Sequence, residues 1–227
     1  MTDARAARVA VAIMAKAPRA GEVKTRLCPP LSHAEAAELY RCFLLDKVAQ
    51  VRTLAGARAV LAFTPDGERS LFGGLGPGFE LIGQGDGDLG RRLLRSIGAL
   101  LGDGYAGALA IDSDTPSLPT GFLQQAVDLV ATPGIDVVLG PCDDGGYYLI
   151  GMRQVWPTLF EAMPWSTAHV LPETVRRAEA QGLRVASLPT WFDVDTPEDL
   201  ERLTASLEAA DSDTAYHTRR FLEERGR

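Results

Sequence analysis

The sequence predicts an α/β fold: a three-layer sandwich in which helices cover both faces of a mostly parallel, mixed sheet. Two observations predict it. Short apolar runs alternate with longer amphipathic stretches, a pattern typical of strands joined by crossover helices. Polar and glycine-rich segments follow several of the apolar runs, as expected where strands end at the ligand-binding edge of such a sheet.

The composition is that of a globular protein. Of the 227 residues, 46% are hydrophobic and 23% are charged, which excludes disordered and fibrous classes. The formal charge of −7 argues against a nucleic-acid partner and leaves room for a local phosphate pocket. The three cysteines and three histidines form neither a disulfide framework nor a zinc motif.

Length and hydropathy set the expected organisation. The first apolar run covers residues 9–15, far short of the ~20 residues that cross a bilayer, and no signal-peptide cleavage site follows it. We therefore expect a cytoplasmic protein without a membrane span. One domain is expected over residues 1–210. The alternating pattern is lost over residues 211–227, which we expect to form a C-terminal tail or peripheral helix.

In the first half of the chain, boundary signals separate strands from helices. Ser32 and Glu35 fit a capping box at the start of a helix, and residues 64–67 (Thr-Pro-Asp-Gly) are a strong turn signal. The predicted strands of this half are 8–14, 57–63 and 79–82, and the predicted helices are 34–54 and 89–101.

The second half repeats the alternation. Ser166 is expected to cap a helix that Gly182 ends, and Pro197 suits the first turn of the last helix. The predicted strands are 106–111, 135–139, 147–152 and 183–188, and the predicted helices are 120–130, 167–181 and one opening at 196–199.

A long basic loop follows the first predicted strand. Loops beyond about 12 residues in compact domains are usually functional or disordered. This one carries Lys16, Arg19, Lys24 and Arg26 around Gly21, which favours a phosphate cradle in which Lys24 and Arg26 neutralise oxygens. The alternative is a solvated surface loop.

Carboxylates follow two other strands. Asp112 and Asp114 come directly after residues 106–111, and Asp193 and Asp195 follow the last strand. The carboxyl ends of parallel strands share one edge of a sheet, so Asp114 and Asp195 can converge on one Mg²⁺ or Mn²⁺ ion. The alternative for each of the two is a turn or a helix cap.

Two further polar segments are weaker signals. Asp144 precedes paired glycines and could act as a base or hold a hydroxyl, or simply lie in a hairpin turn. Gln84, Asp88 and Arg92 lie in a glycine-rich segment and could contact a base, ribose or acceptor. A plain loop and helix start is an equal alternative.

Four motifs occur in order along the chain. They are Lys16-x-Pro18-x-x-Gly21-x-Val23-Lys24-Thr25-Arg26-Leu27, Ser113-Asp114-x-Pro116-x-Leu118, Asp144-Gly145-Gly146-Tyr147-Tyr148-Leu149-Ile150-Gly151 and Asp193-Val194-Asp195-Thr196. Over residues 8–205 the chain resembles the bacterial GT-A-type glycosyltransferases linked to radical-SAM or selenium domains or to arsenosugar biosynthesis. That family belongs to the nucleotide-diphospho-sugar transferase superfamily.

The resemblance implies a Rossmann-like GT-A sandwich whose N-terminal half binds nucleotide and whose C-terminal half shapes the acceptor site. An aspartate stands at position 112, where the family pattern has a small residue such as glycine. It stays open whether Asp112 or Asp193 also binds metal. The resemblance assigns nucleotide binding to Lys16, Gly21, Lys24, Arg26, Gln84, Asp88, Arg92 and Ser113, metal binding to Asp114 and Asp195, and catalysis to Asp144 and Lys24.

The superfamily uses such a site for two reactions. We expect a metal-dependent glycosyltransferase that moves a sugar from a nucleotide-diphospho-sugar to a small-molecule acceptor. The alternative is a nucleotidyltransferase that joins a nucleoside triphosphate to a phosphorylated small molecule and releases pyrophosphate, which the basic loop favours. A catalytically idle nucleotide-binding module is a third class, and a homodimer stays open.

Overall fold

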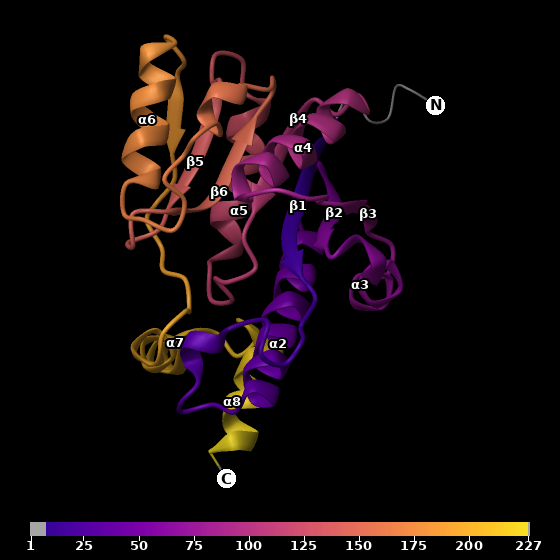
Figure 1. The fold of residues 1–227 in the computed structure, drawn as a ribbon, viewed down its shortest axis with the longest axis vertical. Helices are drawn as coiled ribbons and strands as arrows, with labels where there is room; N and C mark the ends of the chain where they lie inside the picture. The colour runs from indigo at the N-terminus through magenta and orange to yellow at the C-terminus, as the bar shows by residue number, and fades with distance from the viewer. Residues whose placement is uncertain (1–7, 227) are drawn as a thin grey trace.

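A seven-stranded sheet runs through the computed structural model, which describes residues 8–226 (Figure 1). The strand order is β3-β2-β1-β4-β6-β5-β7. Strand β6 runs antiparallel to β4 and β5, whereas the other pairings among the described strands are parallel. The predicted fold class is thereby confirmed. The strands are β1 Val9–Lys16, β2 Ala57–Thr64, β3 Glu80–Gly83, β4 Gly107–Ile111, β5 Val137–Pro141, β6 Tyr147–Met152 and β7 Val185–Ser187.

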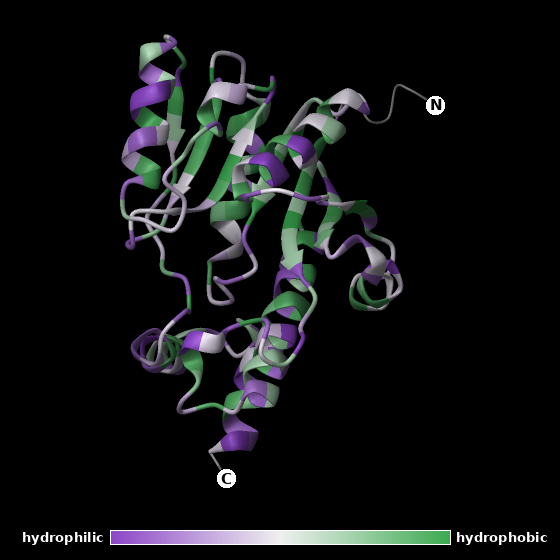
Figure 2. Cartoon of the chain, viewed as in Figure 1, coloured by the Kyte–Doolittle hydropathy of each residue, from purple (hydrophilic) through white to green (hydrophobic). Residues whose placement is uncertain are grey.

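Helices cover both faces of the sheet because successive side chains of a strand point to opposite faces. In β1, Val9, Val11 and Ile13 join a core with α2, α5 and α7, whereas Ala10 and Ala12 join a second core with α4 and α6. Apolar residues accordingly dominate the central strands (Figure 2). The helices are α2 His33–Arg52, α3 Arg69–Leu75, α4 Leu89–Gly102, α5 Thr120–Ala131, α6 Val170–Ala180, α7 Pro197–Ala209 and α8 Tyr216–Arg225, with 3-10 turns η1 Thr25–Leu27, η2 Asp66–Glu68 and η3 Pro157–Leu159.

The predicted cap at Ser166 is wrong. Helix α6 begins at Val170 with His169 as its N-cap, and Ser166 has a positive φ of 61°. The reason is tertiary: the backbone N–H of Leu171 donates to the carbonyl of Gly145 at 2.8 Å, so the loop between β5 and β6 fixes where α6 starts. The capping box at Ser32 and Glu35 is confirmed.

Helix α8 lies along α2 (Figure 1). The buried carboxylate of Asp46 in α2 accepts hydrogen bonds from the backbone N–H groups of His217 and Thr218, at 2.9 and 3.0 Å. The hydroxyl of Thr218 donates to it at 2.6 Å. A remote acid thus takes the place of a local N-cap. The domain boundaries expected at residues 1 and 227 lie outside the described residues, and the division at 210 stays a prediction.

Over residues 8–226, none of the helices is long and apolar enough to span a membrane.

Candidate functional site

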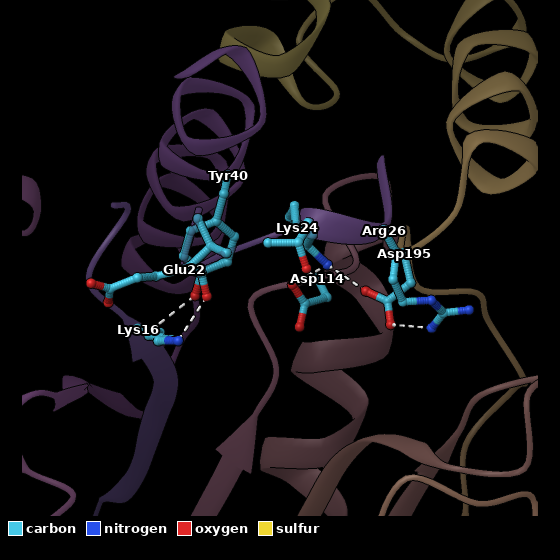
Figure 3. A pocket seen from close by; sticks show the side chains of 9 residues that line it. Lys16, Glu22, Lys24, Arg26, Tyr40, Asp114 and Asp195 are labelled. Carbon is cyan, nitrogen blue, oxygen red and sulfur yellow. Dashed lines mark hydrogen bonds and ion pairs between the residues drawn. The ribbon is translucent and has the colours of Figure 1, made fainter. Parts of the chain in front are cut away.

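The basic loop after β1, the end of β4 and the segment before α7 meet at the carboxyl edge of the sheet (Figure 3). Between them lies a cavity of about 240 Å³. Five of the residues singled out in the sequence line it together, although they come from three separate stretches of chain. The lining residues are Lys16, Glu22, Val23, Lys24, Thr25, Arg26, Tyr40, Asp114 and Asp195.

Lys24 forms the centre of this site. Its Nζ lies 2.5 Å from Oδ1 of Asp114 and 2.8 Å from Oδ1 of Asp195, so the two carboxylates face one point (Figure 3). Arg26 approaches the other oxygen of Asp195 at 3.5 Å. Burial alone would lower the pKa of Lys24, but the charges of Asp114 and Asp195 outweigh it and raise the pKa above its ordinary value. Lys24 is therefore a fixed ammonium.

The loop presents Lys24 through an unusual backbone conformation. Lys24 is in the left-handed region (φ 49°, ψ 34°) directly before η1, which non-glycine residues seldom adopt. Val23 and Leu27 on either side are buried and anchor the loop to the core. The side chain of Lys24 itself is only 4% exposed and its Nζ lies 5.8 Å from the centre of the Phe43 ring.

Neither carboxylate serves as the helix cap that was its alternative role. Thr196 caps α7 through a capping box with Asp199, and the N-cap of α5 is Pro119. Asp114 and Asp195 therefore have their oxygens directed at Lys24 rather than at backbone N–H groups.

Tyr40 is a site residue that the sequence reasoning missed. Its hydroxyl accepts from the backbone N–H of Lys16 at 3.0 Å and lies 2.8 Å from Oγ of Ser113. Ser113 is buried, and its hydroxyl donates to the carbonyl of Met14 at 3.0 Å, which leaves its Oγ to accept from Tyr40. Burial, reinforced by the charge of Asp114, raises the pKa of Tyr40. Helical spacing marks Tyr40 only as a core position, so no sequence signal identifies it.

A buried ion pair lies behind this site. Nζ of Lys47 in α2 is 3.8 Å from Oδ1 of Asp112, to which Thr115 donates at 2.7 Å. Lys47 is fully buried. Burial raises the pKa of Asp112, and the charge of Lys47 opposes that rise. Asp112 is thus engaged with Lys47 and Thr115.

Cys142, Asp144 and Asp193 form a second group that could hold an ion, with one ligand atom of each within 4.8 Å of the others. Burial and the charges of Asp195 and Asp144 raise the pKa of Asp193 to about 6. Burial also raises the pKa of the Cys142 thiol, so it stays protonated and is a poor ligand for a hard cation. Asp114 and Asp195 also direct carboxylate oxygens at one point, and metal binding by these two residues stays a prediction.

Asp144 lies in the hairpin turn between β5 and β6, exposed, with Oδ1 accepting from the backbone N–H of Gly146 at 2.7 Å. Its catalytic role stays a prediction.

The other predicted nucleotide residues do not line the cavity. Gln84 is buried and its amide donates to the carbonyls of Ala15 and Ala62. Asp88 caps α4, Arg92 donates to the carbonyl of Gly87 at 2.9 Å, and Gly21 turns the basic loop with a φ of 78°. Asp88 and Arg92 make contacts within their own segment, whereas Gln84 reaches strands β1 and β2. Nucleotide binding by Gln84, Asp88, Arg92, Gly21 and Ser113 stays a prediction.

Comparison with known proteins gives a family match and several similar solved structures. A family model described as "Uncharacterized protein conserved in bacteria (DUF2064)" matches residues 47–167. None of the curated proteins matches the chain. A protein from Desulfovibrio desulfuricans G20, described as a candidate nucleotide-diphospho-sugar transferase, has a crystal structure that is similar at 32% identity and a TM-score of 0.88, covering 95% of this chain and 94% of that one.

More distant structures share the fold alone. A cytidylyltransferase from Leptospira borgpetersenii is 14% identical with a TM-score of 0.56, covering 96% of this chain and 95% of that one. Rv0371c from Mycobacterium tuberculosis H37Rv, in complex with manganese, is 15% identical with a TM-score of 0.52, covering 88% of this chain and 99% of that one.

Proposed function

This chain belongs to the bacterial family DUF2064. From its similarity to the Desulfovibrio protein, we propose that it is a metal-dependent glycosyltransferase that uses a nucleotide-diphospho-sugar and a small-molecule acceptor. The observation that carries the proposal is the convergence of Asp114 and Asp195 beside the basic loop. Oxygen ligands next to fixed cations suit a diphosphate together with a divalent ion.

The residues divide into two tasks. Lys16, Lys24 and Arg26 neutralise the diphosphate, and Asp114 and Asp195 would hold Mg²⁺ or Mn²⁺. The ion, when bound, supplies charge stabilisation to the departing nucleoside diphosphate. A preorganised cationic loop adds to that stabilisation without reorganising during the reaction.

Asp144 is the proposed base. It is exposed at the hairpin turn and adjoins Asp193 at the same edge of the sheet. It would take the proton of the acceptor hydroxyl as that oxygen bonds to the anomeric carbon and the bond from that carbon to the diphosphate breaks.

One observation favours nucleotidyl transfer as a second candidate. Three cations, Lys16, Lys24 and Arg26, line one cavity of about 240 Å³. In that reaction a phosphorylated small molecule attacks the α-phosphate of a nucleoside triphosphate and pyrophosphate leaves, so more negative charge must be neutralised.

A product assay separates these functions. The protein is incubated with Mg²⁺ and either each nucleotide-diphospho-sugar with candidate acceptors or each nucleoside triphosphate with sugar phosphates. Release of nucleoside diphosphate supports the first proposal, and pyrophosphate release that depends on one phosphorylated acceptor replaces it with the second. If none of these nucleotides raises the melting temperature in the presence of Mg²⁺, the chain is an idle module and both enzymatic proposals fail.

A further inference from the structure

The ammonium of Lys24 occupies the point on which the proposed metal ligands converge. Its Nζ contacts Oδ1 of Asp114 at 2.5 Å and Oδ1 of Asp195 at 2.8 Å (Figure 3). A divalent ion of the size of Mg²⁺ binds carboxylate oxygens at about 2.1 Å. An ion that used both of these oxygens would meet a positive charge that is already there.

The loop positions this ammonium between the two carboxylates. The Lys24 side chain is 4% exposed, and its backbone conformation is one that persists only where the surroundings impose it. Lys24 therefore competes with a divalent ion for the same ligands, as a tethered cation.

We propose that Lys24 is an internal counter-ion that excludes the divalent metal from Asp114 and Asp195. A phosphate group would release the two carboxylates by drawing the Lys24 ammonium away from them. This proposal rests on the proposed function. Phosphate then gives the ammonium another anion to pair with, and the two carboxylates become available to the metal. Metal and phosphate binding are thereby coupled with positive cooperativity.

The other two cations of the cavity, Lys16 and Arg26, do not lie between Asp114 and Asp195 as Lys24 does. Lys16 lines the same cavity, but its Nζ donates to the carbonyl of Glu22 at 2.7 Å. Arg26 is 68% exposed and approaches Asp195 only at 3.5 Å. Lys16→Met is therefore a matched control, because it removes the same charge from the same cavity without freeing either carboxylate.

The test measures Mn²⁺ affinity in the absence of any nucleotide, by titration calorimetry on the full chain. Lys24→Met is expected to bind Mn²⁺ roughly tenfold more tightly than the wild type or better, since the competing cation is gone. Lys16→Met should change the affinity by less than about twofold. Lys24→Arg, which keeps the charge, should bind Mn²⁺ no more tightly than the wild type.

The same variants are titrated with inorganic pyrophosphate without metal. Lys24→Met should bind it roughly tenfold more weakly, in keeping with the loss of a charge-assisted hydrogen bond. Tighter binding of Mn²⁺ together with weaker binding of pyrophosphate by Lys24→Met would support the proposal that Lys24 pairs with the carboxylates or with phosphate in turn. Circular dichroism checks the fold, and Lys24→Gln replaces Lys24→Met if the latter does not fold.

The proposal is overturned if removal of the Lys24 charge leaves Mn²⁺ affinity unchanged, or if Lys16→Met raises it equally. Absence of Mn²⁺ binding in every variant overturns it together with the metal site. The proposed function fails separately, when the wild type turns over none of the nucleotide substrates, because the Mn²⁺ titration needs no nucleotide.

Discussion

The hydroxyl of Tyr40 lies 2.8 Å from Oγ of Ser113 and joins helix α2 to the segment that carries Asp114. The same hydroxyl accepts from the backbone N–H of Lys16, where the basic loop begins. One buried side chain therefore ties two of the segments that line the cavity to a single helix.

Tyr40→Phe removes this tie while keeping the aromatic ring. Lys16 loses the acceptor for its backbone N–H, so we expect a loss of about 1–3 kcal/mol in the free energy of unfolding. Urea unfolding measures it, with Tyr216→Phe as the control because Tyr216 is exposed. An unchanged midpoint for Tyr40→Phe would show that water replaces the hydroxyl without cost.

Asp114→Asn removes a charge but little volume. We expect metal-dependent turnover to fall by roughly a hundredfold or more, because an amide is a weaker ligand than a carboxylate. The melting temperature should fall by only a few degrees. Asp143→Asn is the matched control: Asp143 is exposed and paired with Arg202, so its loss should cost less than about 1 kcal/mol.

If Asp114→Asn unfolds the protein while activity per folded molecule stays at the wild-type level, Asp114 has a structural role only.

Much of the fold can be predicted from the sequence because apolar runs and caps are local signals. Ser32 and Glu35 lie three residues apart and form their capping box without help from the rest of the chain. The approach of Asp114 to Asp195 is also predictable, since it follows from strand ends that share one edge of a sheet.

The remaining features depend on tertiary contacts. Ser166 has the right residue type for a cap, but a hydrogen bond from Leu171 to Gly145 sets the helix start. Helix α3 is short and contains two glycines, so it shows little helical periodicity. Gln84 looks like a ligand contact in a glycine-rich segment, yet its amide satisfies two buried carbonyls. No local pattern reports such partners.

Gly145 lies next to Asp144 and has a φ of 89°. A Cβ added there would lie within 2.4 Å of the carbonyl oxygen of Ala168. Gly145→Ala should therefore cost about 2 kcal/mol or more, from the strained φ and the clash together, and should move Asp144. Guanidinium unfolding and the turnover assay measure both effects.

Gly74→Ala is its counterpart, because Gly74 lies in α3 and no atom other than those of its chain neighbours and its own helix backbone lies within 4 Å of the added methyl group. It should raise the free energy of unfolding by about 0.5–1 kcal/mol. Equal effects of the two substitutions would contradict the steric argument.

Glu173 in α6 gives the protein an acid-sensitive ion pair. Hydrogen bonds from Arg176 and Arg177 lower the pKa of Glu173 from its ordinary value of 4.5 to about 2. Because the pKa is depressed in the folded state, the stabilisation is present above pH 4.5 and is lost as the pH falls towards 2.

Glu173→Gln should accordingly make the free energy of unfolding decline less steeply between pH 4.5 and pH 2, as followed by urea unfolding at each pH. The control is Glu201→Gln, which removes an exposed acid from α7 and should keep the wild-type slope. If the free energy of unfolding falls with pH equally steeply in the wild type and in Glu173→Gln, the ion pair of Glu173 is not the source of the acid sensitivity.

Lys24 and Asp195 are separated by 171 residues. During translation, Lys24 is made before both of its carboxylate partners, first Asp114 and then Asp195. The contact with Asp195 can form only after residue 195 has been translated, so a product that stops before it lacks one of the two carboxylates that face Lys24.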